Sequence, residues 1–307
     1  MISVQNVSKS FGGVKAVNDC SIKVAKGSIT GLIGPNGAGK TTLFNIIAGV
    51  FRPSTGRVML DGKDITSKLP HELFEMGLVR TFQIAQEYSE MTVIENLMVV
   101  PPEQSGESLF SSCVRWGKVR GEEKRVRERA EVVLDFLNLT HLTFERAGNL
   151  SGGQKKLLEL GRTMMTNAKV VLLDEIGAGV NRTLLKTLAS DIERLNRDSG
   201  YTFCLIEHDM ELIARLCDPV IVMAEGSVLT EGTMAEIRKN DEVIEAYLGH
   251  GGGKDAKDRR ARSKPPAKAK AKTGAKTAAK ATARAKAADD PMAKAARAIK
   301  TSRGRAK

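Results

Sequence analysis

The chain has 307 residues, a length that suits one large domain accompanied by additional sequence. Its 48 Lys and Arg residues outnumber its 36 Asp and Glu residues, but the excess is confined to one end. Residues 251–307 carry 19 basic and 4 acidic side chains, whereas residues 1–250 have a net charge of −3. This distribution excludes a uniformly basic nucleic-acid-binding fold and separates a body from a basic tail.

The sequence shows neither a membrane span nor a secretion signal. No apolar stretch approaches the ~18 residues that cross a bilayer, and the N-terminus lacks the basic and then apolar order of a signal peptide. We therefore expect a chain that is made and kept in the cytosol. Four cysteines lie far apart without a C-x-x-C pair, which favours small apolar side chains over disulfides or zinc ligands: Cys20, Cys113, Cys204 and Cys217.

Short apolar runs near both ends of the body predict β-strands, and the middle predicts helices. In chain order the expected strands are Ser28–Ile33, Val58–Leu60 before the turn pair Asp61-Gly62, Val170–Leu173, Thr202–Ile206, and a hairpin of residues 220–223 and 228–230 around Glu225-Gly226. Between them, Thr92 and Glu95 form a capping box, and residues 122–139 place apolar side chains on one helical face. The pattern predicts a mixed α/β body with a helical insertion.

Residues 34–41 follow the first of these apolar runs and precede an expected helix at residues 41–48. They match G-x-x-x-x-G-K-[ST] at every fixed position, and each residue is a candidate nucleotide ligand: Gly34, Pro35, Asn36, Gly37, Ala38, Gly39, Lys40 and Thr41. Glycines let the backbone N–H groups turn toward phosphate oxygens, and the helix N-terminus adds a positive dipole end. Lys40 would bridge the β- and γ-phosphates of ATP, Thr41 would bind Mg²⁺, and Thr42 would add a hydroxyl.

A phosphate-binding loop of this kind needs a carboxylate at the end of a neighbouring strand. The aliphatic run Val170–Leu173 ends in Asp174 and Glu175. Asp174 is the expected Mg²⁺ ligand. Glu175, one residue further, is expected to accept a proton from the water that attacks the γ-phosphate.

A third motif, Leu150-Ser-Gly-Gly-Gln154, follows the helical part of the body. Ser151 can cap the next helix, whose first N–H groups with Gly152 and Gly153 form a second surface suited to phosphate. Together with the P-loop and Asp174-Glu175, this pentapeptide resembles the signature of ATP-binding cassette (ABC) proteins over residues 1–248. The resemblance implies a P-loop NTPase core with an antiparallel β lobe and an inserted α-helical subdomain.

The resemblance also implies roles for individual residues. ATP would lie between the P-loop of one cassette and the signature of a second, identical or homologous cassette, so that Ser151, Gly152, Gly153 and Gln154 contact the partner's nucleotide.

Gln83 is similar to the glutamine that contacts metal and attacking water, and His208 to the switch histidine on the γ-phosphate. Phe11 resembles the aromatic that stacks on adenine, although a core phenylalanine is the alternative. Residues 178–181 occupy the family's D-loop. Ile176 stands where the family usually has proline, which leaves the hydrolysis rate less certain than the catalytic assignment.

The resemblance suggests an organisation and a cargo class. We expect the cassette at residues 1–250, with its helical subdomain at about residues 71–165, and a disordered Lys/Ala/Pro-rich tail at 251–307. Residues 77–83, the stretch beyond them and the ending Glu245–Gly249 look like the longer ATPase subunit of branched-chain amino acid importers; importers of urea or short amides are similar. The implied partners are transmembrane permease subunits, with a periplasmic binding protein acting indirectly, at the cytoplasmic face of a bacterial inner membrane.

Two other classes of function stay open. One is the ATPase of a lipid or lipopolysaccharide exporter. The other is a soluble ABC ATPase whose basic tail binds nucleic acid, although such proteins usually have two fused cassettes or a long coiled-coil insertion. For the tail itself, a merely solubilising role and an anionic partner both stay open. Among anionic partners, lipid head groups are favoured over DNA or RNA, because the implied permease places the body at a negative membrane surface.

Overall fold

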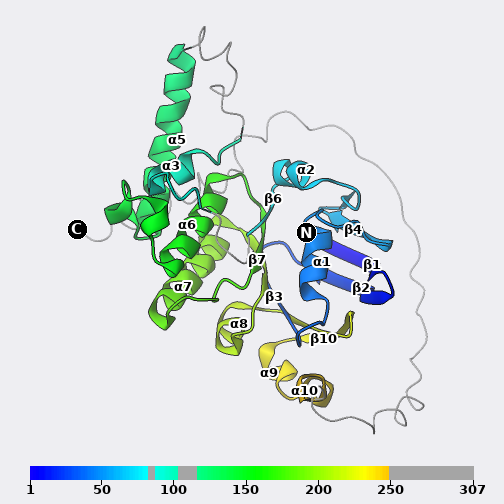
Figure 1. The fold of residues 1–307 in the computed structure, drawn as a ribbon. Coiled ribbons are helices and arrows are strands. Elements are labelled where there is room, and N and C mark those ends of the chain that lie inside the picture. Colours follow the sequence, from blue (N-terminus) through cyan, green and yellow to red (C-terminus); the bar gives the residue numbers. More distant parts are fainter. Residues whose placement is uncertain (82–86, 103–115, 249–307) are drawn as a thin grey trace, which may run out of the picture.

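The computed structural model describes residues 1–81, 87–102 and 116–248 (Figure 1). Gln83, Cys113 and the basic tail lie outside these residues. The first part of the chain comprises β1 (Ile2–Phe11), β2 (Val14–Val24), β3 (Ile29–Ile33), α1 (Lys40–Ile47), β4 (Thr55–Leu60), β5 (Lys63–Asp64), α2 (Pro70–Glu75) and β6 (Leu78–Arg80). Among the described residues, no helix combines the length and apolar character that crossing a bilayer requires.

Helices dominate the middle of the chain, and strands return near its end. The middle comprises α3 (Val93–Met98), α5 (Trp116–Phe136), the 3₁₀ turns η2 (Thr140–Leu142) and η3 (Ala147–Asn149), and α6 (Gly152–Met165). The last part comprises β7 (Val170–Asp174), α7 (Arg182–Ser199), β8 (Thr202–Ile206), α8 (Met210–Leu216), β9 (Val220–Ala224), β10 (Ser227–Gly232), α9 (Met234–Ile237) and α10 (Asp241–Leu248).

Two sheets organise these elements. A six-stranded sheet has the order β10-β9-β3-β8-β7-β6, in which β9, β3, β8, β7 and β6 are parallel and β10 is antiparallel. A four-stranded antiparallel sheet has the order β2-β1-β4-β5. Every residue of β3, β7 and β8 is buried, as expected for parallel strands covered on both faces. This explains why these strands appear in the sequence as uninterrupted apolar runs.

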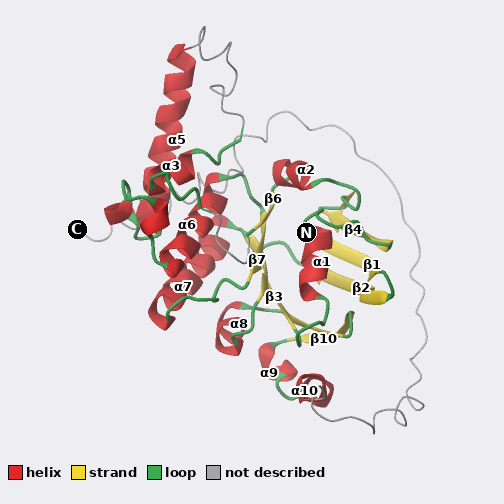
Figure 2. Cartoon of the chain, in the orientation of Figure 1, coloured by secondary structure: helices red, strands yellow, loops and turns green. Residues whose placement is uncertain are grey.

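Each face of the six-stranded sheet contributes to its own core, because successive side chains of a strand point to opposite faces. Val171 and Leu173 of β7 pack in the core that also contains α3, α5, α6 and α7. Val170 and Leu172 pack in the second core, with α1 and the antiparallel sheet. Figure 2 shows the resulting layers. Helices α6 and α7 lie on one side of β3 and β7. Helix α1 lies on the other side, between these two strands and the antiparallel sheet. The predicted α/β core with an antiparallel lobe is confirmed.

Several local predictions are also confirmed. Asp61-Gly62 and Glu225-Gly226 are two-residue turns with positive φ at both positions, the conformation that suits a tight hairpin. Thr92 and Glu95 form the predicted capping box at the start of α3. The three described cysteines, Cys20, Cys204 and Cys217, are buried and free.

The helical part differs from expectation in two respects. The helix expected at residues 122–139 runs from Trp116 to Phe136, and Asn138 with a φ of 57° turns the chain away after it. The range expected for the helical subdomain, about residues 71–165, contains β6, which pairs with β7 in the core sheet. A strand of three residues has too little apolar pattern to be recognised from sequence. The helices that pack together beyond the sheet are α3, α5 and α6.

Candidate nucleotide-binding site

The loop at residues 34–39 connects β3, in the centre of the sheet, to α1. Gly34, Gly37 and Gly39 all have positive φ, which side chains with a Cβ rarely adopt. Two of them also lack space for a side chain, because a Cβ on Gly34 would collide with the Met223 carbonyl oxygen and one on Gly39 with that of Ala16. The loop therefore needs glycine at these positions, and it places the N-terminus of α1 beside the end of β3.

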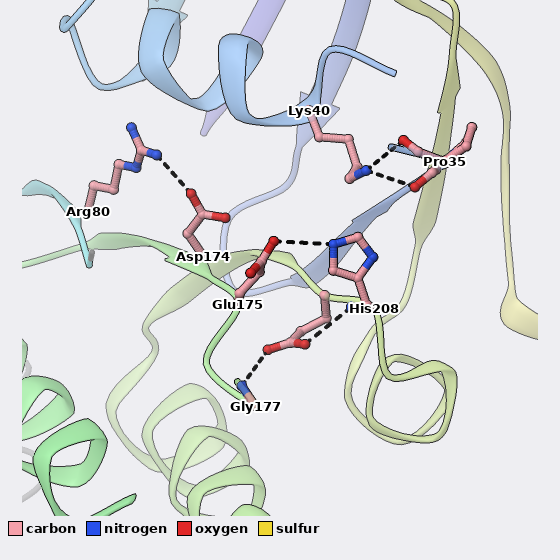
Figure 3. Close-up of polar contacts among 9 residues, drawn as sticks. Pro35, Lys40, Arg80, Asp174, Glu175, Gly177 and His208 are labelled. Atoms are coloured by element: carbon pink, nitrogen blue, oxygen red, sulfur yellow. Dashed lines mark hydrogen bonds and ion pairs between the residues drawn. The ribbon is translucent and has the colours of Figure 1, made fainter. Parts of the chain in front are cut away.

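Lys40 begins α1 and folds back over the loop. Its Nζ donates to the carbonyl oxygens of Gly34 at 2.7 Å and Pro35 at 3.0 Å, and the side chain is buried (Figure 3). Burial lowers the pKa of Lys40, while the Glu175 and Asp174 carboxylates act in the opposite direction. The lysine is thus a buried cation facing the two acidic residues at the end of β7.

Asp174 is the last residue of β7 and is almost fully buried. Its Oδ2 accepts from Arg80 Nη2 at 2.8 Å, and Arg80 Nη1 donates to Asn45 Oδ1 at 2.6 Å. Arg80 therefore links the end of β6 to both β7 and α1. The sequence does not predict this ion pair, because no local pattern identifies β6 as the neighbour of β7.

Glu175 follows Asp174 in an unusual backbone conformation. Its φ is 48°, and its N–H donates to Ile206 O at 2.9 Å, which holds it to the end of β8. Positive φ outside glycine costs free energy and is concentrated at functional positions. Glu175 Oε1 lies 3.2 Å from His208 Nε2 (Figure 3). Because a carboxylate can only accept, Nε2 carries the proton in this contact.

Glu207 is a residue of the site that the sequence analysis did not single out. Its buried carboxylate accepts from the backbone N–H of Gly177 at 2.8 Å and of His208 at 3.2 Å. Burial raises the pKa of Glu207, against the effect of these two donors. Glu207 therefore ties the turn after Glu175 to the segment that carries His208. The sequence signal that could have identified Glu207 is its position as a charged residue directly after the buried run Thr202–Ile206.

Ser151 caps α6 as predicted. Its Oγ accepts from the Gln154 N–H at 3.4 Å, and Gln154 Oε1 accepts from the Ser151 N–H at 2.9 Å. Gly153 packs so closely on α7 that a Cβ there would collide with Leu184 Cδ2. Within the part of the chain that the structure describes, no hydrogen bond or ion pair joins residues 151–154 to residues 34–42 of the same chain.

Phe11 ends β1 at the protein surface. Its side chain is 44% exposed, and its ring lies edge-on to Phe51 with a centroid distance of 5.3 Å. The alternative of a core phenylalanine is therefore wrong; Lys9 Nζ lies over the exposed ring, 5.2 Å from its centroid. The expected metal and water ligand Gln83 lies outside the described residues, so the structure does not place it. Ile176, where the family usually has proline, is buried in the core beside the sheet.

Comparison with known proteins identifies this arrangement. Residues 17–178 match the ABC transporter family. A crystal structure of a nucleotide-free ATP-binding cassette from an ABC transporter aligns with a TM-score of 0.69 and 39% identity, covering 80% of this chain and 98% of that one. The ADP conformation of an ATP-binding cassette aligns with a TM-score of 0.69 and 40% identity, covering 81% and 98%. The chain therefore belongs to the ABC transporter family and is a nucleotide-binding cassette, an ATPase coupled to transport.

A more particular similarity comes from the end of the described chain. Residues 227–252 match the branched-chain amino acid ATP-binding cassette transporter family. The probable branched-chain amino acid transport ATP-binding protein LivG of Archaeoglobus fulgidus is 46% identical over 250 residues, covering 81% of this chain and 95% of the relative. The high-affinity branched-chain amino acid transport ATP-binding protein BraF of Pseudomonas aeruginosa is 37% identical over 249 residues, covering 81% and 98%.

Proposed function

We propose that this cassette is the ATP-hydrolysing motor of an importer for branched-chain amino acids. The observation that carries the proposal is the match of residues 227–252 to the branched-chain amino acid transporter family, together with relatives of that name at 37–46% identity. We assign the chain to the cytoplasmic face of the membrane, where it would drive transmembrane permease subunits served by a substrate-binding protein.

Within the site, we assign nucleotide binding to the loop of residues 34–39 and to Lys40, Thr41 and Thr42. The positive-φ glycines and the buried Lys40 ammonium suit the triphosphate of ATP, since both present N–H donors and positive charge to phosphate oxygens. Phe11, exposed at the end of β1, is assigned to adenine stacking.

The residues at the end of β7 fit a divalent cation. Thr41 offers a hydroxyl and Asp174 a carboxylate, and oxygen ligands of this kind suit Mg²⁺. We assign Mg²⁺ to these two residues and to Gln83. When bound, Mg²⁺ would offset negative charge on the β- and γ-phosphates. Arg80 holds Oδ2 of Asp174 and thereby fixes the orientation of the carboxylate that faces the loop.

Hydrolysis is assigned to Glu175 and His208. Glu175 would accept the proton of the attacking water, and its position is set by the Ile206 carbonyl and by the turn that Glu207 ties down. His208 Nε2, within 3.2 Å of that carboxylate, would orient it and contact the γ-phosphate.

The signature surface is assigned to the nucleotide of a second cassette. Ser151, Gly152, Gly153 and Gln154 begin α6, where the helix N-terminus favours negative charge. ATP would then lie between two chains arranged head to tail, each nucleotide held by the loop of one chain and the signature surface of the other.

Reconstitution tests the proposed cargo. In proteoliposomes that contain this chain, the permease subunits and the substrate-binding protein, we expect leucine, isoleucine or valine to stimulate ATP hydrolysis several-fold, because a motor coupled to import responds to loaded binding protein. The measurement is phosphate release with and without each amino acid. Stimulation by urea or a short amide alone would contradict the branched-chain assignment.

The basic tail is proposed to bind anionic lipid. Residues 251–307 carry 19 basic and 4 acidic side chains, and each Lys or Arg near a negative membrane surface contributes ~1 kcal/mol before ordering entropy is subtracted. Ending the chain after Gly249 is expected to leave ATP hydrolysis intact and to remove salt-sensitive binding to anionic vesicles. Co-sedimentation with anionic and neutral vesicles measures this. Equal binding of both chains would make the tail merely solubilising, and preferential capture by competing DNA would make nucleic acid its partner.

A further inference from the structure

A pocket away from the nucleotide-binding loop lies between the end of α5 and α7. Its volume is about 530 Å³, within the range of small-molecule sites. Its walls include Phe136 and Asn138 at the end of α5, and Lys186, Ser190, Asp191 and Arg194 along α7. None of its lining residues belongs to the loop of residues 34–42, to the end of β7 or to the signature.

Asp191 is the most deeply buried charged residue in the wall of this pocket. Its side chain is only 5% exposed, yet one oxygen, Oδ2, is buried without a hydrogen-bond partner among the described residues. The other oxygen, Oδ1, has a long contact of 3.4 Å with Arg194 Nη1. Burial raises the pKa of Asp191 to about 6, because this single weak contact does not offset the loss of water. A buried acceptor of this kind is stabilised by an N–H donor, and most strongly by an ammonium group.

The surroundings of Asp191 add positive charge and an apolar surface. The Arg194 guanidinium lies over the Phe136 ring, with Cζ 4.0 Å from the ring centroid. Stacking keeps the guanidinium at one place beside the pocket, where its other N–H groups can meet an anion. Lys186, exposed and two helical turns before Arg194, adds a second cation to the same wall.

We propose that this pocket binds a free α-amino acid. The ammonium group would donate to Asp191, the carboxylate would meet Arg194 and Lys186, and a short aliphatic side chain would lie against Phe136. A simple anion would leave Asp191 without a donor, and a simple amine would leave the two cations without an acceptor. A zwitterion, with both charges on adjacent carbon atoms, satisfies both sets of groups.

The pocket is connected to the candidate ATP site through α7. Asn181 caps this helix by accepting from the Leu184 N–H at 2.9 Å, and Leu184 packs tightly against Gly153 of the signature. A ligand that joins α7 to the end of α5 would therefore act on the helix that supports the signature. Such an effect on ATP hydrolysis rests on the proposed function, whereas binding of the amino acid does not.

Calorimetry on the full-length chain tests the proposal with three probes of matched shape. L-leucine carries both charges, isoamylamine has only the ammonium group, and 4-methylpentanoate has only the carboxylate. We expect L-leucine to bind with a Kd of about 1 mM or below, and each analogue to bind at least about tenfold more weakly. Failure of L-leucine to bind at about 20 mM, or binding of either analogue as tight as that of L-leucine, overturns the proposal.

Two variants locate the binding. Asp191→Asn keeps the shape of the side chain and is expected to weaken L-leucine binding at least about tenfold, whereas Asp198→Asn, exposed on the same helix, should not change it. Arg194→Gln should weaken binding of L-leucine but leave the weak binding of isoamylamine as it was. ATP affinity, measured in parallel, should be the same in all three variants. L-leucine binding that is unchanged by Asp191→Asn and Arg194→Gln contradicts the site. Absence of ATP hydrolysis by the unmodified chain, with L-leucine binding present, would contradict the proposed function alone.

Discussion

Replacing Glu175 with glutamine is expected to lower the rate of ATP hydrolysis by roughly 10²-fold or more while ATP binding is retained. Glutamine has nearly the same size and can keep a hydrogen bond with His208, but its amide cannot take a proton from water. The backbone at this position already has a φ of 48°, a conformation that any residue other than glycine pays a similar energy to adopt. The loss is therefore expected in turnover rather than in folding.

Phosphate release and equilibrium binding of ATP, measured on the same preparation, separate these effects. Glu211→Gln, at an exposed position in the first turn of α8, is the control for removal of one carboxylate near the site. A variant trapped with ATP should also stay associated with a second cassette. Near-normal hydrolysis in Glu175→Gln would assign proton transfer to another group.

Replacing Arg80 with methionine is expected to reduce the free energy of unfolding by about 3 kcal/mol. The guanidinium is the partner of Asp174 Oδ2 and also bonds Asn45 Oδ1, so its removal leaves a buried carboxylate without its cation and an amide without its donor. Methionine fills most of the vacated volume. The loss therefore reports mainly the uncompensated charge.

The pair Arg80→Met with Asp174→Asn checks the cause. A neutral asparagine needs no counter-charge, so the double variant should be more stable than Arg80→Met alone, as urea unfolding at neutral pH would measure. Strictly additive losses would mean that the ion pair contributes nothing beyond the two separate side chains.

The strands and motifs that the sequence predicted are those whose local pattern is strong. The runs Val170–Leu173 and Thr202–Ile206 are buried parallel strands, and their apolar continuity follows directly from burial on both faces. The backbone conformation requires glycine at positions 34 and 39, and both are fixed positions of the motif G-x-x-x-x-G-K-[ST]. The cap formed by Ser151 and Gln154 depends on residues three positions apart and was predictable for the same reason.

Contacts between segments far apart in the sequence could not be predicted. The ion pair of Arg80 with Asp174 joins residues 94 positions apart, and it depends on the pairing of β6 with β7. The hydrogen bond from Gly177 to Glu207 and the contact of Glu175 with His208 likewise depend on the order of β7 and β8 in the sheet. Asp191 lies where the end of α5 meets α7, and one of its oxygens has no partner there. The spacing of residues within one helix does not predict which other helix lies beside it.

The measurement that tests the central assignment most directly is the number of ATP molecules bound to a mixed pair of cassettes. One chain carries Lys40→Ala and its partner carries Ser151→Arg. The two chains have different tags, so that pairs containing one of each can be purified. A head-to-tail pair then contains one doubly damaged site and one intact site, whereas each variant alone contains two damaged sites. We expect about one ATP per mixed pair and nearly none for either variant alone. A mixed pair that binds no ATP would contradict a site shared between two chains.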